Sequence, residues 1–159
     1  THADERWLHC DIKSISLLGN VMARQLSADH GAVETIMLRD GPQGGPWLTE
    51  ASASNVWVAH EGALLGPPKS DHMLEGIRVD LLRELCEECG VAYNLRPISE
   101  ADLRAADEVM LSSATKEILA VTRLDGELVG HGALRGKPGP VYAKLHEAYQ
   151  RAKATQSMA

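Results

Sequence analysis

The stretch IRVDLLRELCEECGVAYNL, residues 77–95, contains in order a helix, the signal that ends it and a strand. Its apolar residues at helical spacing are Leu81, Leu82 and Leu85. Such a stripe predicts an amphipathic helix over residues 77–89 that packs on a core. Gly90 is the residue type that most often closes a helix. A strand is expected at residues 93–95, so helix and sheet follow one another here.

The residues before this stretch predict a further helix and two strands. Apolar residues recur every three or four positions over residues 15–30, and Gly31 follows at the position of a helix cap. Residues 33–38 and 55–59 are rich in strand-forming residues, and a Gly/Pro-rich stretch at 40–46 turns the chain after the first of them. We expect these two strands to pair.

The residues after the opening stretch predict several short elements. Ser99 followed by Asp102 is typical of a capped helix start. The other expected elements are strands at residues 109–111 and 118–124, a hairpin turn at Asp125-Gly126 leading into residues 128–129, and a last helix from about Pro140. Strands interleaved with helices, without an internal repeat or a linker, predict a single α/β domain over residues 1–159.

Length and composition agree with a folded domain and argue against several classes of partner. With 159 residues, of which 44% are hydrophobic and 24% charged, the chain is long enough to bury a core. The formal net charge is -6, and no Lys/Arg cluster is interleaved with aromatic residues, so no nucleic acid partner is expected. No apolar run is long enough to span a bilayer, so no membrane association is expected.

The cysteines and the first residue give two further expectations. Three cysteines, an odd number, indicate free thiols in a reducing compartment, which predicts a cytoplasmic protein. Cys86 and Cys89 form a Cys-x-x-Cys motif without a second pair or a histidine set at zinc-ligand spacing, so we expect core packing rather than a zinc site. The chain opens with Thr1 and runs at once into motif-bearing sequence, which indicates a fragment of a longer protein.

Four segments carry side chains suited to chemistry. Lys13 lies between an apolar residue and a helix start, where partial desolvation would favour its neutral, nucleophilic amine. Glu50 and several hydroxyl groups, including Ser54, lie at the mouth of a strand. Gly76 opens a helix whose first N–H groups can approach a phosphate, and Ser113 ends an apolar strand in a second set of hydroxyls. Each pattern alone also fits a solvated lysine, an ordinary turn or an ordinary helix start.

Two longer blocks resemble a known family. WLHCDIKS, residues 7–14, resembles the segment around the Schiff-base lysine of the fold-type IV, or class IV, aminotransferases, which depend on pyridoxal phosphate. TEASASNV, residues 49–56, resembles the Glu-Gly-Ser-Ser-Ser-Asn block of the same family. The resemblance covers nearly the whole chain and is strongest to the family members that act on D-amino acids. It implies that Lys13 binds the cofactor and carries the proton, and that Glu50 pairs with the pyridine nitrogen.

The resemblance also implies cofactor contacts for other residues. Leu74 would pack on the cofactor ring, the backbone N–H of Ile77 would bind the phosphate, and Ser113 would lie beside the phosphate. Arg78 stands where the family has a threonine that contacts the phosphate, and we expect it to bind by charge instead. Ala114 replaces a second small or hydroxyl residue. The expected cofactor residues are Lys13, Glu50, Ser54, Leu74, Ile77, Arg78, Ser113 and Ala114.

The implied fold is a mixed-sheet pseudo-barrel with flanking helices, the large C-terminal domain of this family. The implied reaction is transfer of the amino group of an amino acid, a D-amino acid above all, to a 2-oxo acid by a homodimer. Branched-chain aminotransferase and aminodeoxychorismate lyase stay open as alternatives that share Lys13 and Glu50. In this family the residues that grip the substrate carboxylate come from an N-terminal domain absent here, so a folded but inactive fragment is a further alternative.

Overall fold

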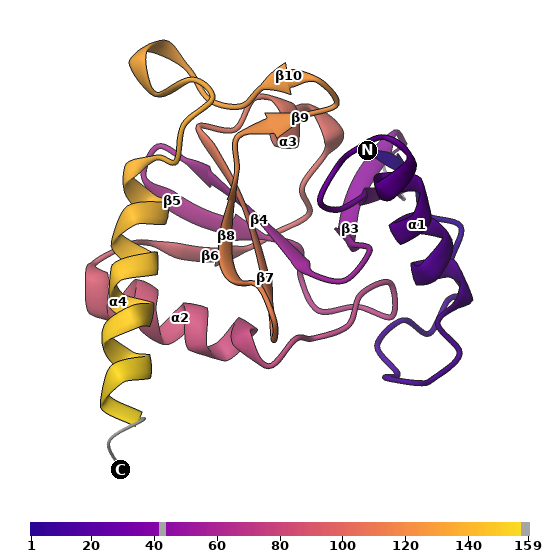
Figure 1. The fold of residues 1–159 in the computed structure, drawn as a ribbon, viewed down its shortest axis with the longest axis horizontal. Coiled ribbons are helices and arrows are strands. Elements are labelled where there is room, and N and C mark those ends of the chain that lie inside the picture. Colours follow the sequence, from indigo (N-terminus) through magenta and orange to yellow (C-terminus); the bar gives the residue numbers. More distant parts are fainter. Residues whose placement is uncertain (42–43, 157–159) are drawn as a thin grey trace.

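The computed structural model describes residues 1–41 and 44–156 and shows a mixed α/β fold (Figure 1). Its larger sheet has five strands in the order β6, β5, β4, β7, β8. The strands are β4 Asn55–His60, β5 Ala63–Gly66, β6 Tyr93–Leu95, β7 Glu108–Ser113 and β8 Glu117–Val121. β5 and β6 run parallel and the other neighbours run antiparallel, so this sheet is mixed.

The remaining strands form a second mixed sheet and a hairpin. They are β1 His2–Ala3, β2 Ile36–Asp40, β3 Pro46–Ala51, β9 Arg123–Leu124 and β10 Glu127–Leu128. β2 is the central strand of the second sheet, parallel to β1 and antiparallel to β3. β9 and β10 pair through the turn at Asp125 and Gly126, whose φ angles of 48° and 84° lie in the left-handed region. This hairpin confirms the expected turn.

The pairing expected between residues 33–38 and 55–59 is wrong. β2 pairs with β3, whereas β4 pairs with β5 and β7. β3 carries Thr49 and Glu50, polar residues that the fold buries, so its residue pattern does not indicate a strand. The turn expected at residues 40–46 includes Pro42 and Gln43, which lie outside the described residues.

Four α-helices accompany the sheets in the described part of the chain. They are α1 Leu18–Asp29, α2 Arg78–Cys89, α3 Glu100–Arg104 and α4 Pro140–Gln156, with a short 3-10 helix at Gly132–Leu134. α2 ends as expected on Gly90 with a φ of 64°, and Ser99 and Asp102 form the expected capping box of α3. α1 begins at Leu18, later than the expected residue 15, and no side chain caps its N-terminus.

Both faces of the larger sheet are buried, because α2 and α4 cover one face and the smaller sheet and α3 pack on the other. Alternate side chains of β4 pack on opposite faces of the sheet. Trp57 belongs to the apolar cluster under α2 and α4, and Val56 belongs to the cluster under the smaller sheet and α3. The Nε1 of Trp57 donates to Ser112 Oγ at 2.9 Å, which satisfies the polar atom of a buried ring. Cys86 is fully buried in the same cluster, which confirms its expected role in packing.

A carboxylate at the start of β7 fixes the start of α4. The Oε1 of Glu108 accepts from the backbone N–H of Val141, and its Oε2 accepts from that of Tyr142, each at 2.8 Å. Gly139 lies so close that an added Cβ would be 2.3 Å from the carboxyl carbon of Glu108. A negative charge here satisfies free N–H groups at the positive end of the helix dipole. Strand and helix are therefore joined by one side chain.

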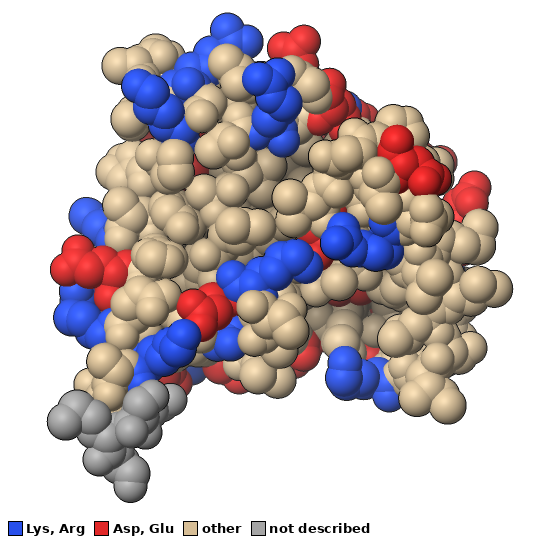
Figure 2. All heavy atoms as spheres, viewed as in Figure 1, with Lys and Arg blue, Asp and Glu red and all other residues tan. Residues whose placement is uncertain are grey.

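The surface combines mixed charge with one exposed apolar segment. Figure 2 shows Lys and Arg side chains interspersed with Asp and Glu on this face, with a row of mostly basic side chains across its middle. The segment of residues 7–22 exposes large apolar side chains, which are Trp7, Leu8, Ile12, Ile15, Leu17, Leu18, Val21 and Met22. Among the described helices, none has the length and apolar character that crossing a membrane requires.

Candidate active site

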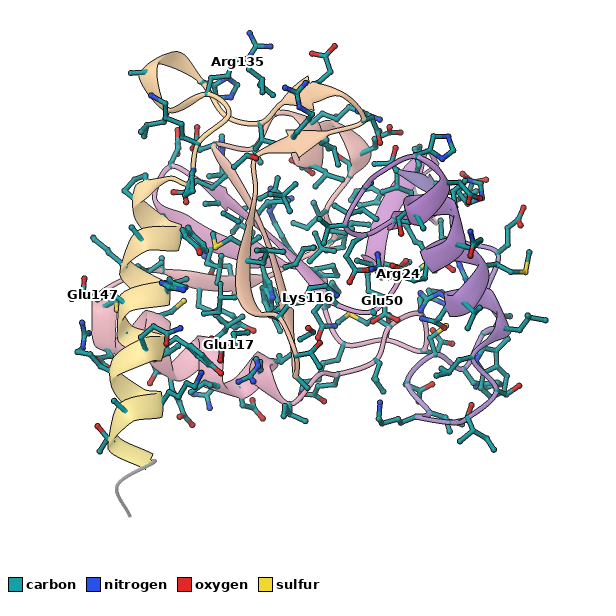
Figure 3. All side chains as sticks on the ribbon, in the orientation of Figure 1. Arg24, Glu50, Lys116, Glu117, Arg135 and Glu147 are labelled. Atoms are coloured by element: carbon teal, nitrogen blue, oxygen red, sulfur yellow. The ribbon has the colours of Figure 1, made fainter. Side chains whose placement is uncertain are left out.

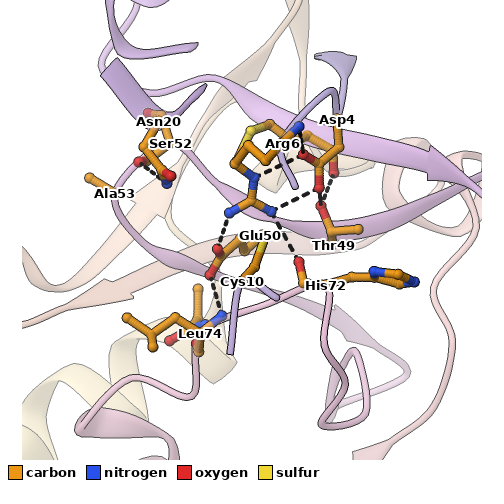
Figure 4. Close-up of polar contacts among 12 residues, drawn as sticks. Asp4, Arg6, Cys10, Asn20, Thr49, Glu50, Ser52, Ala53, His72 and Leu74 are labelled. Atoms are coloured by element: carbon orange, nitrogen blue, oxygen red, sulfur yellow. Dashed lines mark hydrogen bonds and ion pairs between the residues drawn. The ribbon is translucent and has the colours of Figure 1, made fainter. Parts of the chain in front are cut away.

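Glu50, expected to pair with the cofactor ring, lies buried in β3 (Figure 4). Its Oε1 accepts from Arg6 Nη1, and its Oε2 accepts from the backbone N–H of Leu74 at 3.1 Å. Burial raises the pKa of Glu50 above its ordinary value, and the adjacent Arg6 guanidinium opposes that rise. Glu50 and Leu74, both expected from the sequence, are thus in direct contact.

Arg6 is the centre of a buried ion network. Its guanidinium donates from Nε and Nη2 to the two carboxylate oxygens of Asp4, each at 2.8 Å, and from Nη2 to the carbonyl of His72 at 3.0 Å. Burial alone would raise the pKa of Asp4, but hydrogen bonds from Arg6 and Thr49 lower it to about 2. Arg6 is thereby held rigidly while its remaining amino group, Nη1, faces Glu50.

Asn55 holds the loop between β5 and α2. Its Nδ2 donates to the carbonyl of Leu74 at 2.8 Å, and its Oδ1 accepts from the backbone N–H of Gly76 at 3.2 Å. A Cβ on Gly76 would be 2.4 Å from that Oδ1, so the close approach requires glycine. The loop thus holds half-buried Leu74 against Glu50 and leads to Ile77, which is exposed.

The turn between β7 and β8 meets the start of α2. Arg78, the first residue of α2, donates from Nε to the carbonyl of Ser113 at 2.6 Å and from Nη2 to that of Ala114 at 2.9 Å. Its guanidinium also lies 4.9 Å from the centre of the Tyr149 ring. Arg78, Ser113 and Ala114, all expected at the phosphate, are therefore brought together, with two guanidinium N–H groups occupied by carbonyls.

Ser54 belongs to a second buried polar cluster, centred on Glu34. Glu34 accepts from the hydroxyl of Ser54 at 3.0 Å, the backbone N–H of Ala53 at 3.0 Å and the hydroxyl of Ser52. It also forms an ion pair with Lys116 of the β7–β8 turn. Burial would raise the pKa of Glu34, but the hydrogen bonds from Lys116 and the two serines hold it below its ordinary value.

Lys13 does not have the desolvated environment expected from the sequence. It is exposed in the loop before α1, and its side chain has no hydrogen bond or ion pair with residues 1–41 or 44–156. The apolar residue next to it, Ile12, is 54% exposed, so it provides no cover either. The desolvation expected for Lys13 is therefore wrong for this chain by itself.

Five charged residues of these clusters were not expected from the sequence: Asp4, Arg6, Glu34, Lys116 and Arg39, which forms an ion pair with Asp4. Each belongs to a residue type that is mostly exposed in proteins, and each partner is identified only by the fold. The only local signal is the position of Asp4 and Arg6 directly before the WLHCDIKS block.

Comparison with known proteins places these residues in a family. The family model described as amino-transferase class IV matches residues 1–124 of the chain. The chain belongs to the class IV aminotransferases. It is 39% identical over 150 residues to D-alanine aminotransferase of Bacillus licheniformis, covering 94% of this chain and 50% of that protein. It is 38% identical over 149 residues to D-alanine aminotransferase of Listeria monocytogenes, covering 94% of this chain and 48% of that protein.

Solved structures show the same fold as this class IV aminotransferase chain. Branched-chain amino acid aminotransferase from Thermobaculum terrenum in its PLP-form superposes with a TM-score of 0.79 at 24% identity, covering 95% of this chain and 49% of that one. The match confirms the expected mixed α/β fold class with flanking helices. The chain spans about half the length of the curated relatives it matches.

Proposed function

We propose that this chain is the cofactor-binding part of a pyridoxal-phosphate-dependent aminotransferase that transfers amino groups between D-amino acids and 2-oxo acids. The observation that carries the proposal is Glu50, a buried carboxylate whose two oxygens are fixed by Arg6 and by the N–H of Leu74. Family membership and the D-alanine aminotransferase relatives support it.

The residues around Glu50 fit the ring of pyridoxal phosphate. This cofactor supplies an electron sink for amino acid chemistry while its ring nitrogen is held protonated. Each carboxylate oxygen has two lone pairs, so Glu50 can accept a ring N–H in addition to its present donors. Arg6, always protonated, favours the ionised form of Glu50 that this task requires. Leu74, joined to Glu50 through its backbone, offers an apolar side chain for one face of the ring.

The region where α2 meets the β7–β8 turn fits the phosphate. Ile77 lies at the N-cap of α2, where free N–H groups and the helix dipole favour an anion. Ser113 adds a hydroxyl from the turn, and Arg78 adds positive charge beside it. Ser54 contributes indirectly, because its hydroxyl fixes the loop of residues 51–54 through Glu34. This donor set supports the proposal of a phosphate site.

Lys13 is the proposed nucleophile and proton carrier. A neutral amine is needed for both roles, and removal from water favours the neutral form. We propose that the amine becomes desolvated when the exposed apolar segment of residues 7–22 is covered by polypeptide that this chain does not contain. The same reasoning assigns the grip on the substrate carboxylate to residues outside the chain, within a cytoplasmic homodimer.

Covalent labelling tests the cofactor proposal directly. The intact natural polypeptide is mixed with pyridoxal phosphate, reduced with borohydride and digested, and the pyridoxyl mass is located by peptide mapping. We expect the mass on Lys13, its loss in Lys13→Arg, and no change in Lys144→Met, which removes an exposed amine of α4. A protein that folds but acquires no pyridoxyl mass on Lys13 contradicts the proposal.

Substrate preference separates the readings within the family. The same polypeptide is assayed with D-alanine and with L-leucine as amino donor to 2-oxoglutarate, and D-alanine is expected to react faster. A preference for L-leucine supports the branched-chain alternative. The structural neighbour from Thermobaculum terrenum is named as an enzyme of that kind. Turnover of aminodeoxychorismate without any amino acceptor supports the lyase.

A further inference from the structure

We infer that Lys116 and Arg78 are positioning residues that hold the β7–β8 turn against the serine loop and the start of α2, so that the phosphate site is assembled before the cofactor binds. The inference rests on the proposed function, since it assigns a role within the same site. The serine loop is defined as residues 51–54 and the turn as residues 113–117.

Glu34 joins the turn to the serine loop. Its side chain is 2% exposed, and its carboxylate accepts from the hydroxyls of Ser52 and Ser54, the N–H of Ala53 and the ammonium of Lys116. Three donors of the serine loop therefore bind one carboxylate. Lys116 is the cation that compensates this buried charge, and without it the carboxylate would be strongly disfavoured.

Arg78 joins the same turn to α2. A guanidinium in the first turn of a helix opposes the helix dipole, so its position there needs a compensating interaction. The carbonyls of Ser113 and Ala114 provide it through two hydrogen bonds, and the ring of Tyr149 provides a cation–π contact. The start of α2 cannot move from the turn without losing both hydrogen bonds, and the ring contact ties the same guanidinium to α4.

The turn is also anchored on a third side. Glu117 has a φ of 58°, a left-handed conformation uncommon for a residue with a side chain. Its carboxylate accepts from Gln150 Nε2 at 3.0 Å and from Lys153 Nζ at 2.6 Å, both on α4. Figure 3 shows Glu117 on the side of the turn toward α4 and Lys116 on the opposite side. Neighbouring residues thus fasten the turn in opposite directions.

Four variants of the intact natural polypeptide test the inference. They are Lys116→Met, Lys116→Arg, Glu34→Gln and the control Lys144→Met. We measure the Kd for pyridoxal phosphate, hydrogen–deuterium exchange of residues 113–117 in the cofactor-free protein, and thermal unfolding. Lys116→Met is expected to raise the Kd about tenfold and to speed exchange in the turn, because the buried carboxylate loses its cation. Lys116→Arg restores both values, and Lys144→Met changes neither.

The outcomes separate the two proposals. If the parent protein binds pyridoxal phosphate and Lys116→Met matches it in Kd and in exchange, the positioning role is wrong. If the parent protein does not bind the cofactor, the proposed function fails, while exchange in the turn still decides whether Lys116 holds it. Should Lys116→Met unfold, Glu34→Gln replaces it, because it removes the ion pair yet keeps an oxygen for the serines. Unchanged exchange in Glu34→Gln overturns the inference.

Discussion

Arg6 compensates two buried carboxylates at once, and this makes it the most connected residue of the candidate site. Its side chain is 4% exposed and faces Asp4 on one edge and Glu50 on the other. Bidentate geometry suits a guanidinium and not an ammonium, because its N–H groups lie in one plane at fixed spacing. Arg6 therefore links the orientation of Glu50 to the first residues of the chain.

The substitution Arg6→Met is expected to lower the free energy of unfolding by about 3–5 kcal/mol, because buried Glu50 loses its cation and Asp4 keeps only its ion pair with Arg39. Urea unfolding followed by circular dichroism measures the loss. The matched control is Arg83→Met on α2, where an exposed arginine pairs with Glu87 four residues along the helix. That change is expected to cost about 0.5 kcal/mol or less. Equal losses in both variants would show that the buried network does not stabilise the fold.

Residues of the candidate site could be predicted from the sequence where a short local pattern indicates them. Glu50 stands in a run of small hydroxyl residues, and Gly76 precedes an amphipathic helix, so both are visible in short windows. The compensating charges are not visible, because Arg6 lies 44 residues from Glu50, and Lys116 lies 82 residues from Glu34. Only the folded topology brings such pairs together.

At the scale of elements, α4 depends on β7 for its start. Pro140 opens the helix, as is favourable at a first helical position, and the following N–H groups bind the carboxylate of Glu108. Glu108 is only 7% exposed, so water does not readily replace its hydrogen bonds to α4.

The substitution Glu108→Ala is expected to lower the free energy of unfolding by about 2 kcal/mol, through two lost hydrogen bonds to a charged acceptor. Faster hydrogen–deuterium exchange at the first turn of α4 should accompany the loss. Glu147→Ala removes an exposed carboxylate of the same helix, paired with Arg151, and is expected to change stability by less than about 0.5 kcal/mol (Figure 3). Unaltered exchange at Val141 and Tyr142 in Glu108→Ala would contradict the capping role.

Element positions follow from local sequence better than element pairing does. Gly90 ends α2, and Ser99 with Asp102 starts α3, because these signals act within a few residues. The partner of β4 was misjudged, since strand pairing depends on contacts between distant residues that no window contains. β3 could not be predicted from its residue pattern either, because its polar residues Thr49 and Glu50 are buried in the candidate site.

At the scale of the whole molecule, two mixed sheets share a core while the segment of residues 7–22 exposes its apolar side chains. This distribution agrees with a chain that spans about half the length of its relatives. The residues proposed to face the cofactor lie mainly on β3, the loop before α2 and the β7–β8 turn, which buried polar groups tie to the rest of the fold.

Acid should weaken the fold through Asp4. Its pKa is about 2 in the fold and 3.8 ordinarily, so its stabilising effect is complete above about pH 4 and is lost as the pH falls through about 2. The size of the effect is about 2 kcal/mol. Glu50 has a raised pKa in the fold, so its effect has the opposite sign: protonation of Glu50 as the pH falls favours the folded state.

Comparison of the parent protein with Asp4→Asn isolates this contribution. The difference in urea unfolding free energy between the two proteins should shrink by about 2 kcal/mol between pH 5 and pH 2. A difference that stays constant over this interval would show that Asp4 does not titrate with a lowered pKa.

Two of the three tryptophans lie at opposite depths, so a variant that lacks the half-buried Trp47 carries two optical reporters. Trp57, 2% exposed and hydrogen-bonded to Ser112, emits from an apolar interior, whereas Trp7, 52% exposed, emits from water beside the Lys13 loop. A dissolved quencher such as iodide reaches only the exposed ring. One emission spectrum, recorded with and without quencher, therefore distinguishes a change in the core from a covering of the loop that carries Lys13.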